Sequence, residues 1–250
     1  MTGKFKDHFS AHAQDYGQYR PDYPEEMFSY LSSLTSAHQV AWDCATGNGQ
    51  AAGTLAEHFH QVIATDASAE QVGQATPIKD VEFRCATAEN SSLENNSVDL
   101  ITVAQALHWF DMPAFACEVE RVLVDGGVLA VWTYGLMNIQ NDIDELILRL
   151  YRDVVGPYWP FERTMVENGY ADIVFPFTEL ETPAFEMGLQ WDLGQVMGYL
   201  NTWSAVKAYE KDKGENPLQA LLAELSELWG DSSRQYSVTW PLKLRVWRKP

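Results

Sequence analysis

Cysteine is scarce in this chain. The 250 residues contain three cysteines, Cys44, Cys85 and Cys117, and no two of them form a C-x-x-C pair. An odd number of widely spaced cysteines argues against a disulfide framework and against a zinc site. Each of them lies in a segment with the pattern of a strand or a helix. We therefore expect buried, reduced thiols of the kind that a reducing cytosol maintains.

Long apolar runs are also lacking. No run approaches the roughly 20 residues that span a bilayer, and residues 1–18 are too polar for the apolar core of a secretory signal. We therefore expect a cytoplasmic protein without a membrane partner. His8 and His12 have the i, i+4 spacing of metal ligands on a helix. No third ligand accompanies them, so we expect no metal site.

Basic residues are few relative to acidic ones. The chain has 17 Lys and Arg against 35 Asp and Glu, which gives a formal net charge of −18. Nucleic-acid binding depends on neutralising phosphates, so this balance disfavours a DNA or RNA partner. Three basic residues near the end, Lys243, Arg245 and Arg248, are better explained as the exposed side of a strand. The same net charge favours a cationic ligand.

Short apolar runs alternate with helical segments in the first half of the chain. The predicted strands are residues 40–45, 61–65, 81–85, 98–104 and 128–133. A helix with Phe115 and Val119 on one face precedes the last of them and should stop at the glycine pair Gly126-Gly127. Strands that alternate with helices predict an α/β fold with a doubly wound, mostly parallel sheet.

Beyond Gly135 this rhythm is lost and aromatic residues become frequent. We predict a single domain over residues 1–250, with residues 36–135 as a cofactor-binding core. Residues 1–35 and 155–235 are interpreted as an aromatic-rich lid or cap, and residues 236–250 as the last strand of the sheet. The cap should cover the carboxyl ends of the parallel strands, because the ligand crevice of an open α/β sheet lies there.

A glycine turn follows the first strand. Gly47-x-Gly49-x-x-Ala52 lies between a strand and a helix and matches the dinucleotide fingerprint, and Asp66 ends the next strand near the expected distance. Glycine lets the backbone approach a ligand closely, and an acid at that position can bind ribose hydroxyls. These features predict a ribonucleoside cofactor and leave open whether it is NAD(P) or S-adenosylmethionine.

The surrounding residues resemble the class I S-adenosylmethionine-dependent methyltransferases, in the methyltransferase type 11 group. In Asp43-Cys-Ala-Thr-Gly-Asn-Gly an acid closes the first strand before the turn, although Ala45 stands where the family usually has its first glycine. The resemblance continues through Asp66-Ala67, Ala88-Glu89, the segment 97–109 and the segment 120–130. It implies a Rossmann-like, seven-stranded sheet. The implied cofactor-binding residues are Tyr16, Arg20, Asp43, Ala45, Gly47, Gly49, Asp66, Ala67, Ala88, Glu89 and Gln105.

The N-terminal segment from Phe9 to Pro24 is similar to the lid of the small-molecule branch of this family. Trp159, Arg163 and the segment 199–204 resemble a subgroup that includes trans-aconitate methyltransferase-like enzymes. The resemblance implies a small-molecule acceptor, with a carboxylate among the candidates, and a protein that is a monomer or weak homodimer. The implied acceptor-binding residues are Tyr19, Trp109, Tyr134, Trp159 and Trp203.

His108 is the one histidine placed to act as a general base beside the reacting methyl group. A loop histidine that only orders its neighbours explains the sequence equally well. Two other functions stay open at this point. One is an NAD(P)-dependent oxidoreductase that uses the Gly47 turn, and the other is a non-catalytic nucleotide-binding module. Asp43 argues against the first, because a dinucleotide has no cationic amino-acid end for it to meet.

Overall fold

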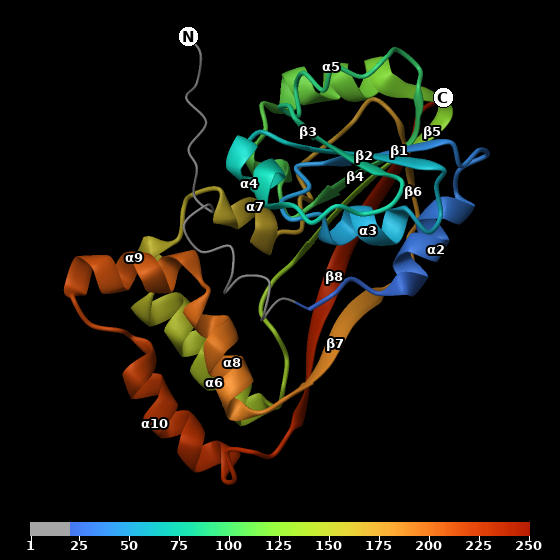
Figure 1. The fold of residues 1–250 in the computed structure, drawn as a ribbon. Helices are drawn as coiled ribbons and strands as arrows, with labels where there is room; N and C mark the ends of the chain where they lie inside the picture. The colour runs from blue at the N-terminus through green and yellow to red at the C-terminus, as the bar shows by residue number, and fades with distance from the viewer. Residues whose placement is uncertain (1–20) are drawn as a thin grey trace.

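The computed structural model describes residues 21–250, which are built around one sheet (Figure 1). The strand order is β3-β2-β1-β4-β5-β8-β6, and β7 pairs with β8 outside this path. The strands are β1 (Val40–Cys44), β2 (Gln61–Asp66), β3 (Val81–Cys85), β4 (Val98–Ala104), β5 (Leu123–Tyr134), β6 (Thr178–Leu180), β7 (Phe185–Trp191) and β8 (Tyr236–Arg248). Strands β1 to β5 are parallel to one another, and β8 is antiparallel to its three neighbours. The predicted α/β, mostly parallel sheet is confirmed, with β7 as one strand more than the seven expected.

Helices cover both faces of this sheet. On one face lie α2 (Glu25–Ser33) and α3 (Gln50–Leu55), and on the other lie α5 (Met112–Val122) and α7 (Arg163–Glu167). The short helix α4 (Ala69–Gln74) packs beside β2 and β3, and its N-cap Ser68 accepts a hydrogen bond from the Gln71 amide. The strand β4 has the predicted bounds, and its apolar run is buried because helices cover both of its faces.

The junction of α5 and β5 differs from the prediction. The helix ends at Val122, and β5 begins at Leu123 rather than at residue 128. Leu123 is fully buried and pairs with Val98 of β4, so extended pairing starts before the glycines. Gly126 has a positive φ of 77° inside the strand, and its amide donates to the Lys249 carbonyl. The glycine pair therefore accommodates an irregularity within β5 instead of ending the helix.

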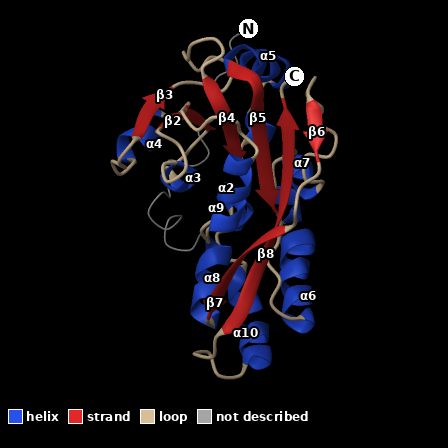
Figure 2. Cartoon of the chain, turned by 90° about the vertical axis from the view of Figure 1, so that its right-hand side faces the viewer, coloured by secondary structure: helices blue, strands red, loops and turns tan. Residues whose placement is uncertain are grey.

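The second half contributes β8, which was predicted as the last strand, and two strands that were not predicted, β6 and β7. Strand β8 is 13 residues long. Its C-terminal part pairs with β5, and its N-terminal part continues beyond the sheet as a ribbon with β7 (Figure 2). Strand β6 pairs with the last residues of β8. Residues 178–191 thus belong to the sheet and its ribbon, not to the cap in which we expected them.

The helices of the second half form a cap at one end of the sheet. They are α6 (Asn141–Arg149), α8 (Leu193–Asn201), α9 (Ser204–Lys213) and α10 (Leu218–Trp229). The arrowheads of β4 and β5 point toward this cap, so it lies at the carboxyl ends of the parallel strands (Figure 2). It begins at residue 141, earlier than expected, because α6 packs against α10. A π-helical turn, Leu150–Val154, continues α6.

The cysteine expectation is correct for one residue and wrong for two. Cys44 is buried in β1, but Cys85 and Cys117 are exposed, and all three are free. Cys85 lies on β3, the edge strand, and Cys117 lies on the outer side of α5. Within residues 21–250, every helix is too short or too polar to cross a bilayer.

Candidate functional site

The end of β1 carries a carboxylate that is shielded from solvent. Asp43 is 1% exposed. Its Oδ1 accepts a hydrogen bond from Thr102 Oγ1 at 2.8 Å, and its Oδ2 accepts one from Thr46 Oγ1 at 2.6 Å. Burial raises the pKa of Asp43 to about 6, against the lowering effect of the two threonine hydroxyls, and the charge of Asp66 raises the pKa further. No Lys or Arg side chain of residues 21–250 forms an ion pair with Asp43.

The turn after β1 is left-handed at alternate residues. The φ angles are +58° at Ala45, +58° at Gly47 and +87° at Gly49. Ala45 therefore adopts the conformation that a glycine takes without strain, which is unfavourable by roughly 1–2 kcal/mol for a residue with a Cβ. A Cβ built on Gly47 would meet no described atom within 4 Å, whereas one on Gly49 would lie 2.8 Å from Phe83 Cζ. Among residues 21–250, the backbone at Gly47 therefore borders open space, whereas a side chain at Gly49 would collide with Phe83.

Asp66 connects the end of β2 to this turn. Its Oδ2 accepts a hydrogen bond from the Gly47 amide at 3.0 Å, and its Oδ1 accepts one from the Ser68 amide at 2.9 Å. Ala67 lies between Asp66 and Ser68 in the chain and is partly buried. The carboxylate therefore fixes the glycine turn relative to the next strand.

The charges of the three predicted cofactor-binding acids, Asp43, Asp66 and Glu89, act on one buried thiol. Burial raises the pKa of Cys44, and the charges of Asp43, Glu89 and Asp66 raise it further. These acids come from the ends of β1 and β2 and from the segment after β3. The fold therefore places negative charge from three segments at the carboxyl ends of neighbouring strands.

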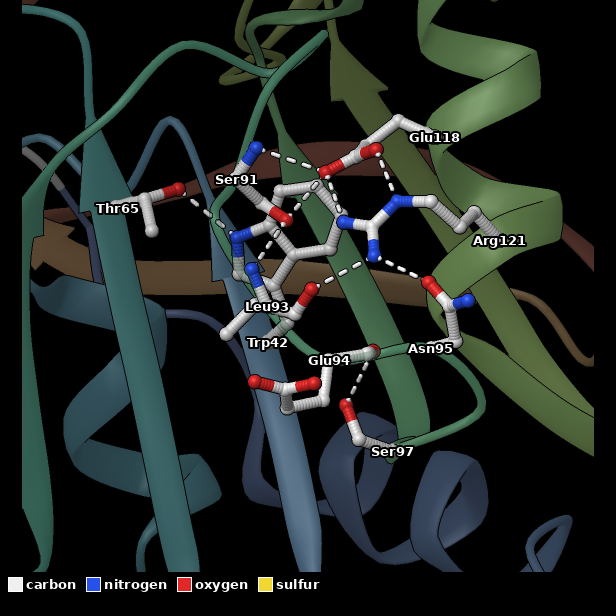
Figure 3. Close-up of polar contacts among 9 residues, drawn as sticks. All are labelled: Trp42, Thr65, Ser91, Leu93, Glu94, Asn95, Ser97, Glu118 and Arg121. Atoms are coloured by element: carbon white, nitrogen blue, oxygen red, sulfur yellow. Dashed lines mark hydrogen bonds and ion pairs between the residues drawn. The ribbon is translucent and has the colours of Figure 1, made fainter.

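The segment after β3 is fixed to helix α5. Glu89 Oε1 accepts a hydrogen bond from the Asp111 amide at 3.0 Å, and the adjacent Ala88 is 7% exposed. Further along the segment, Ser91 bonds to Glu118, which is paired with Arg121 (Figure 3). Sequence reasoning missed these last three residues. The only signal was an acid and an arginine one helical turn apart.

Gln105 occupies the loop that follows β4. Its φ is +55°, again left-handed for a residue with a side chain. Its Nε2 donates to the Tyr134 carbonyl at 3.1 Å, and Thr133 Oγ1 donates to its Oε1. Tyr134 ends β5 and is 5% exposed. The side chain of Gln105 therefore connects the ends of β4 and β5, and backbone strain of this kind is frequent at functional sites.

His108 follows in a 3₁₀ turn, Leu107–Trp109. Its Nδ1 lies 2.9 Å from Tyr170 Oη, and its ring lies against Trp109 with centroids 4.6 Å apart. Burial lowers the pKa of His108 to about 4, and the positive charge of Arg163 lowers it further, against a smaller opposite effect of Glu162. The imidazole is therefore neutral at physiological pH.

An aromatic cluster lies between α6, α8 and α9. Trp203 contacts Tyr151 and Trp159, each at a centroid distance of 5.7 Å, and Tyr199 at 6.3 Å. Arg163 lies beside this cluster, with Cζ 4.7 Å from the Trp159 ring centroid. Its Nε donates to Tyr151 Oη at 2.9 Å. Within residues 21–250 the half-buried guanidinium of Arg163 forms no ion pair.

The predicted site residues fall into two connected groups. The cofactor group lies at or after the ends of β1, β2, β3 and β4. In the acceptor group, Tyr134 ends β5, Trp109 lies in the turn after β4, and Trp159 and Trp203 lie in the aromatic cluster. Trp109 is at the outer edge, 36% exposed. Tyr16, Tyr19 and Arg20 lie outside the described residues. A separate cavity of about 360 Å³ between α6 and α10 is lined by none of the predicted residues. No metal-binding group of His, Cys, Asp or Glu occurs in residues 21–250.

Comparison with known proteins identifies the family. Residues 42–131 match the family described as a methyltransferase domain. A Dictyostelium discoideum protein named as a methyltransferase is 34% identical over 98% of this chain and 96% of its own length. A solved structure from Anaeromyxobacter dehalogenans, described as a type II methyltransferase, is 40% identical. It covers 92% of this chain and 98% of its own, with a TM-score of 0.88. The chain belongs to the class I S-adenosylmethionine-dependent methyltransferases.

Membership of this family confirms the resemblance seen in the sequence and excludes the oxidoreductase alternative. A Schizosaccharomyces pombe protein named as an uncharacterized methyltransferase extends the likeness at 26% identity, over 88% of this chain and 86% of its own. The match with the Dictyostelium protein runs through the cap as well as the sheet. The likeness to methyltransferases therefore extends over nearly the whole chain, whereas the names of these relatives do not state a methyl acceptor.

Proposed function

We propose that this methyltransferase holds S-adenosylmethionine at the turn after β1 and transfers its methyl group to a small molecule under the cap. The observation that carries the proposal is Asp43, a buried carboxylate without a basic partner in residues 21–250, beside the open backbone of Gly47. A buried charge needs compensation, and the amino-acid end of the cofactor brings a cationic ammonium and sulfonium. The residues present therefore fit the cofactor that the family implies.

Each segment of the site is assigned one part of the cofactor. Asp43, Ala45, Gly47 and Gly49 surround the amino-acid end, with Asp43 acting through its charge and through Thr46. Asp66 and Ala67 face the ribose, Ala88 and Glu89 face the adenine, and Gln105 lies over the reacting end. The cofactor supplies a methyl group that its sulfonium already activates. What the chain must add is alignment of the acceptor with the methyl group and exclusion of water.

The cap supplies the acceptor side. Tyr134, Trp159 and Trp203 are the proposed walls, with Trp109 at the entrance and Tyr19 from the N-terminal segment. Aromatic walls with few polar groups are usual for small-ligand pockets. The buried contacts of Trp203 with Tyr151 and Trp159 support this assignment, because they give the walls a fixed shape.

A carboxylate is the acceptor group that we propose, and Arg163 is the observation that favours it. Arg84, Arg121, Arg149 and Arg245 each pair with a carboxylate of the protein. The guanidinium of Arg163 instead lies over the Trp159 ring next to His108, with no ion-pair partner in residues 21–250. Arginine binds carboxylates through two parallel hydrogen bonds. In a chain of net charge −18, an anionic acceptor needs such a local cation.

His108 has two candidate roles, general base and positioning residue, and its pKa helps to separate them. Its lowered pKa, about 4, makes it a weak base, and a carboxylate acceptor is already deprotonated and needs none. We therefore propose that His108 positions the acceptor together with Tyr170, while general-base catalysis stays a prediction. With a carboxylate acceptor, turnover should not change between pH 6 and 9, because His108 and the acceptor both stay deprotonated. With a phenol or amine acceptor, turnover should rise with pH, because the acceptor must lose a proton before it reacts.

Formation of S-adenosylhomocysteine tests this proposal. Purified protein with S-adenosylmethionine is offered a panel of small carboxylic acids and the matching neutral amides. We expect turnover with acids and none with their amides. Arg163→Met should lower kcat/KM for the acid by about 10- to 150-fold, the range for a lost hydrogen bond to a charged group. The exposed Arg152→Met serves as the control and should behave as wild type. Equal turnover of acids and amides would exclude a carboxylate acceptor.

A further inference from the structure

The segment between β3 and β4, residues 86–97, contains no helix or strand, yet it is held by a polar network (Figure 3). Glu118 Oε1 accepts hydrogen bonds from the Ser91 amide at 2.8 Å and from Ser91 Oγ at 2.5 Å. Arg121 Nη1 donates to the Leu93 carbonyl and to Asn95 Oδ1, both at 2.7 Å. Two residues of α5 therefore hold three alternate positions of the segment, Ser91, Leu93 and Asn95.

The two residues of α5 also hold each other. Arg121 donates to both carboxylate oxygens of Glu118 at 2.8 Å, a bidentate pair. Glu118 is 7% exposed and Ser91 is fully buried. Burial alone would raise the pKa of Glu118, but hydrogen bonds from Arg121 and Ser91 outweigh it and lower the pKa to about 2. The network is therefore charged and intact throughout the physiological pH range.

The held segment has a strained backbone. Ser92 has a φ of +59°, which a residue with a side chain adopts only when its surroundings impose it. At Ser92 the conformation is imposed by the hydrogen bonds of its two neighbours, Ser91 to Glu118 and Leu93 to Arg121. Residues two and three positions before Ser91 are Glu89 and Ala88, and Glu89 is bonded to the start of α5 at Asp111.

We propose that Glu118 and Arg121 are positioning residues for the adenine end of the cofactor. By holding residues 91–95 against α5 they fix the backbone that presents Ala88 and Glu89 to the purine. This proposal rests on the proposed function, because the adenine is placed at Ala88 and Glu89 only there. It adds residues that touch no ligand and act through the segment they hold.

A purely structural role for the network predicts a different outcome. Loss of this partly buried ion pair would then lower the melting temperature and leave the folded variant with unchanged ligand affinity. A positioning role predicts a loss of affinity that depends on the purine. The measurement must therefore compare two ligands that differ only at the base, at a temperature well below the unfolding of every variant.

Calorimetry with S-adenosylhomocysteine and S-inosylhomocysteine makes this comparison. Wild type should bind the adenine ligand more tightly than the hypoxanthine ligand. Glu118→Gln should weaken binding of the adenine ligand by about 3- to 30-fold, the range for residues that modulate a site through neighbours, and should reduce the preference between the two ligands. Ser91→Ala removes one hydroxyl and should act in the same direction. Glu82→Gln, which breaks the exposed Glu82–Arg84 pair on β3, should change neither value.

Three results would overturn the proposal. The first is a folded Glu118→Gln or Ser91→Ala variant with wild-type affinity for S-adenosylhomocysteine. The second is an equal fold-loss of affinity for both ligands, and the third is a wild type that does not distinguish the two ligands. If Glu118→Gln does not fold, Ser91→Ala alone decides. Failure of wild type to bind S-adenosylhomocysteine at all would instead contradict the proposed function.

Discussion

Replacing Asp43 by asparagine removes a charge from the interior while keeping the shape of the side chain. The two threonine hydroxyls that donate to Asp43 can each donate or accept, so Thr46 and Thr102 can still bond to an amide. We therefore expect the variant to fold, and the difference from wild type to report the charge of Asp43.

The sign and size of the change in stability follow from the pKa of Asp43. It is raised from 3.8 to about 6 in the folded protein, so folding favours the protonated form. The stability that this gives is fully present below pH 3.8 and is lost as the pH rises through 6. A shift of roughly two pKa units corresponds to about 3 kcal/mol. Above pH 6 the variant should be more stable than wild type by up to that amount, and near pH 3.8 the difference should vanish.

The same replacement should weaken the cofactor site. Without the carboxylate charge, the affinity for S-adenosylhomocysteine at pH 8 should fall, since the ligand's ammonium loses its counter-charge. Wild-type affinity should also fall as the pH drops below 6, and the variant's affinity should not follow it. Urea unfolding and calorimetry, each from pH 4 to 8, measure the two effects.

Asp99→Asn is the matched control. Asp99 is buried in the same sheet but accepts bonds from the Gln39 and Val40 amides at the opposite end of β4. It should leave ligand affinity unchanged. The reasoning is refuted if Asp43→Asn is less stable than wild type at pH 8, or if it binds the ligand as tightly.

Three further replacements test other parts of the site. Ala45→Gly should raise the free energy of unfolding by about 0.5–1 kcal/mol, because glycine takes a positive φ without strain. Its control Ala56→Gly, at a φ of −67°, should lower that free energy. A change of the same sign in both variants, measured by urea unfolding, would contradict the argument. Asp66→Ala should weaken S-adenosylhomocysteine binding by about 1.5–3 kcal/mol in calorimetry, and unchanged affinity in a folded variant would assign the ribose to another residue. Trp203→Ala should reduce turnover of the acceptor far more than the affinity for S-adenosylhomocysteine, and equal losses would place Trp203 outside the acceptor pocket.

The parallel half of the fold could be read from the sequence because each element there has its own signal. Strand β4 is a buried run of mostly apolar residues, and the glycines after β1 mark the turn. Strand β7 was missed although Phe185, Met187, Leu189 and Trp191 alternate with other residues as a strand requires. Because aromatic residues are frequent on both sides of it, this segment was assigned to the cap. Strand β6 has three residues, too few for any pattern.

The arrangement of the candidate site could be predicted where one short segment carries its residues, and not where distant segments meet. Asp43, Gly47 and Asp66 lie next to strand ends that the sequence shows. The contact of His108 with Tyr170 joins positions 62 residues apart, and that of Ser91 with Glu118 joins positions 27 apart. Such contacts depend on how α5 and α7 pack on the sheet. Nothing in the local sequence around either partner encodes them.

Calorimetric titration of the wild-type protein with S-adenosylhomocysteine, with NADH as the control, tests the central claim most directly. We predict binding at one site per chain and a higher melting temperature, since a ligand at 100 times its Kd adds about 2.7 kcal/mol to the stability of the folded state. NADH should give neither heat nor a shift. Absence of both signals with saturating S-adenosylhomocysteine would contradict the assignment of the cofactor to the turn at Gly47.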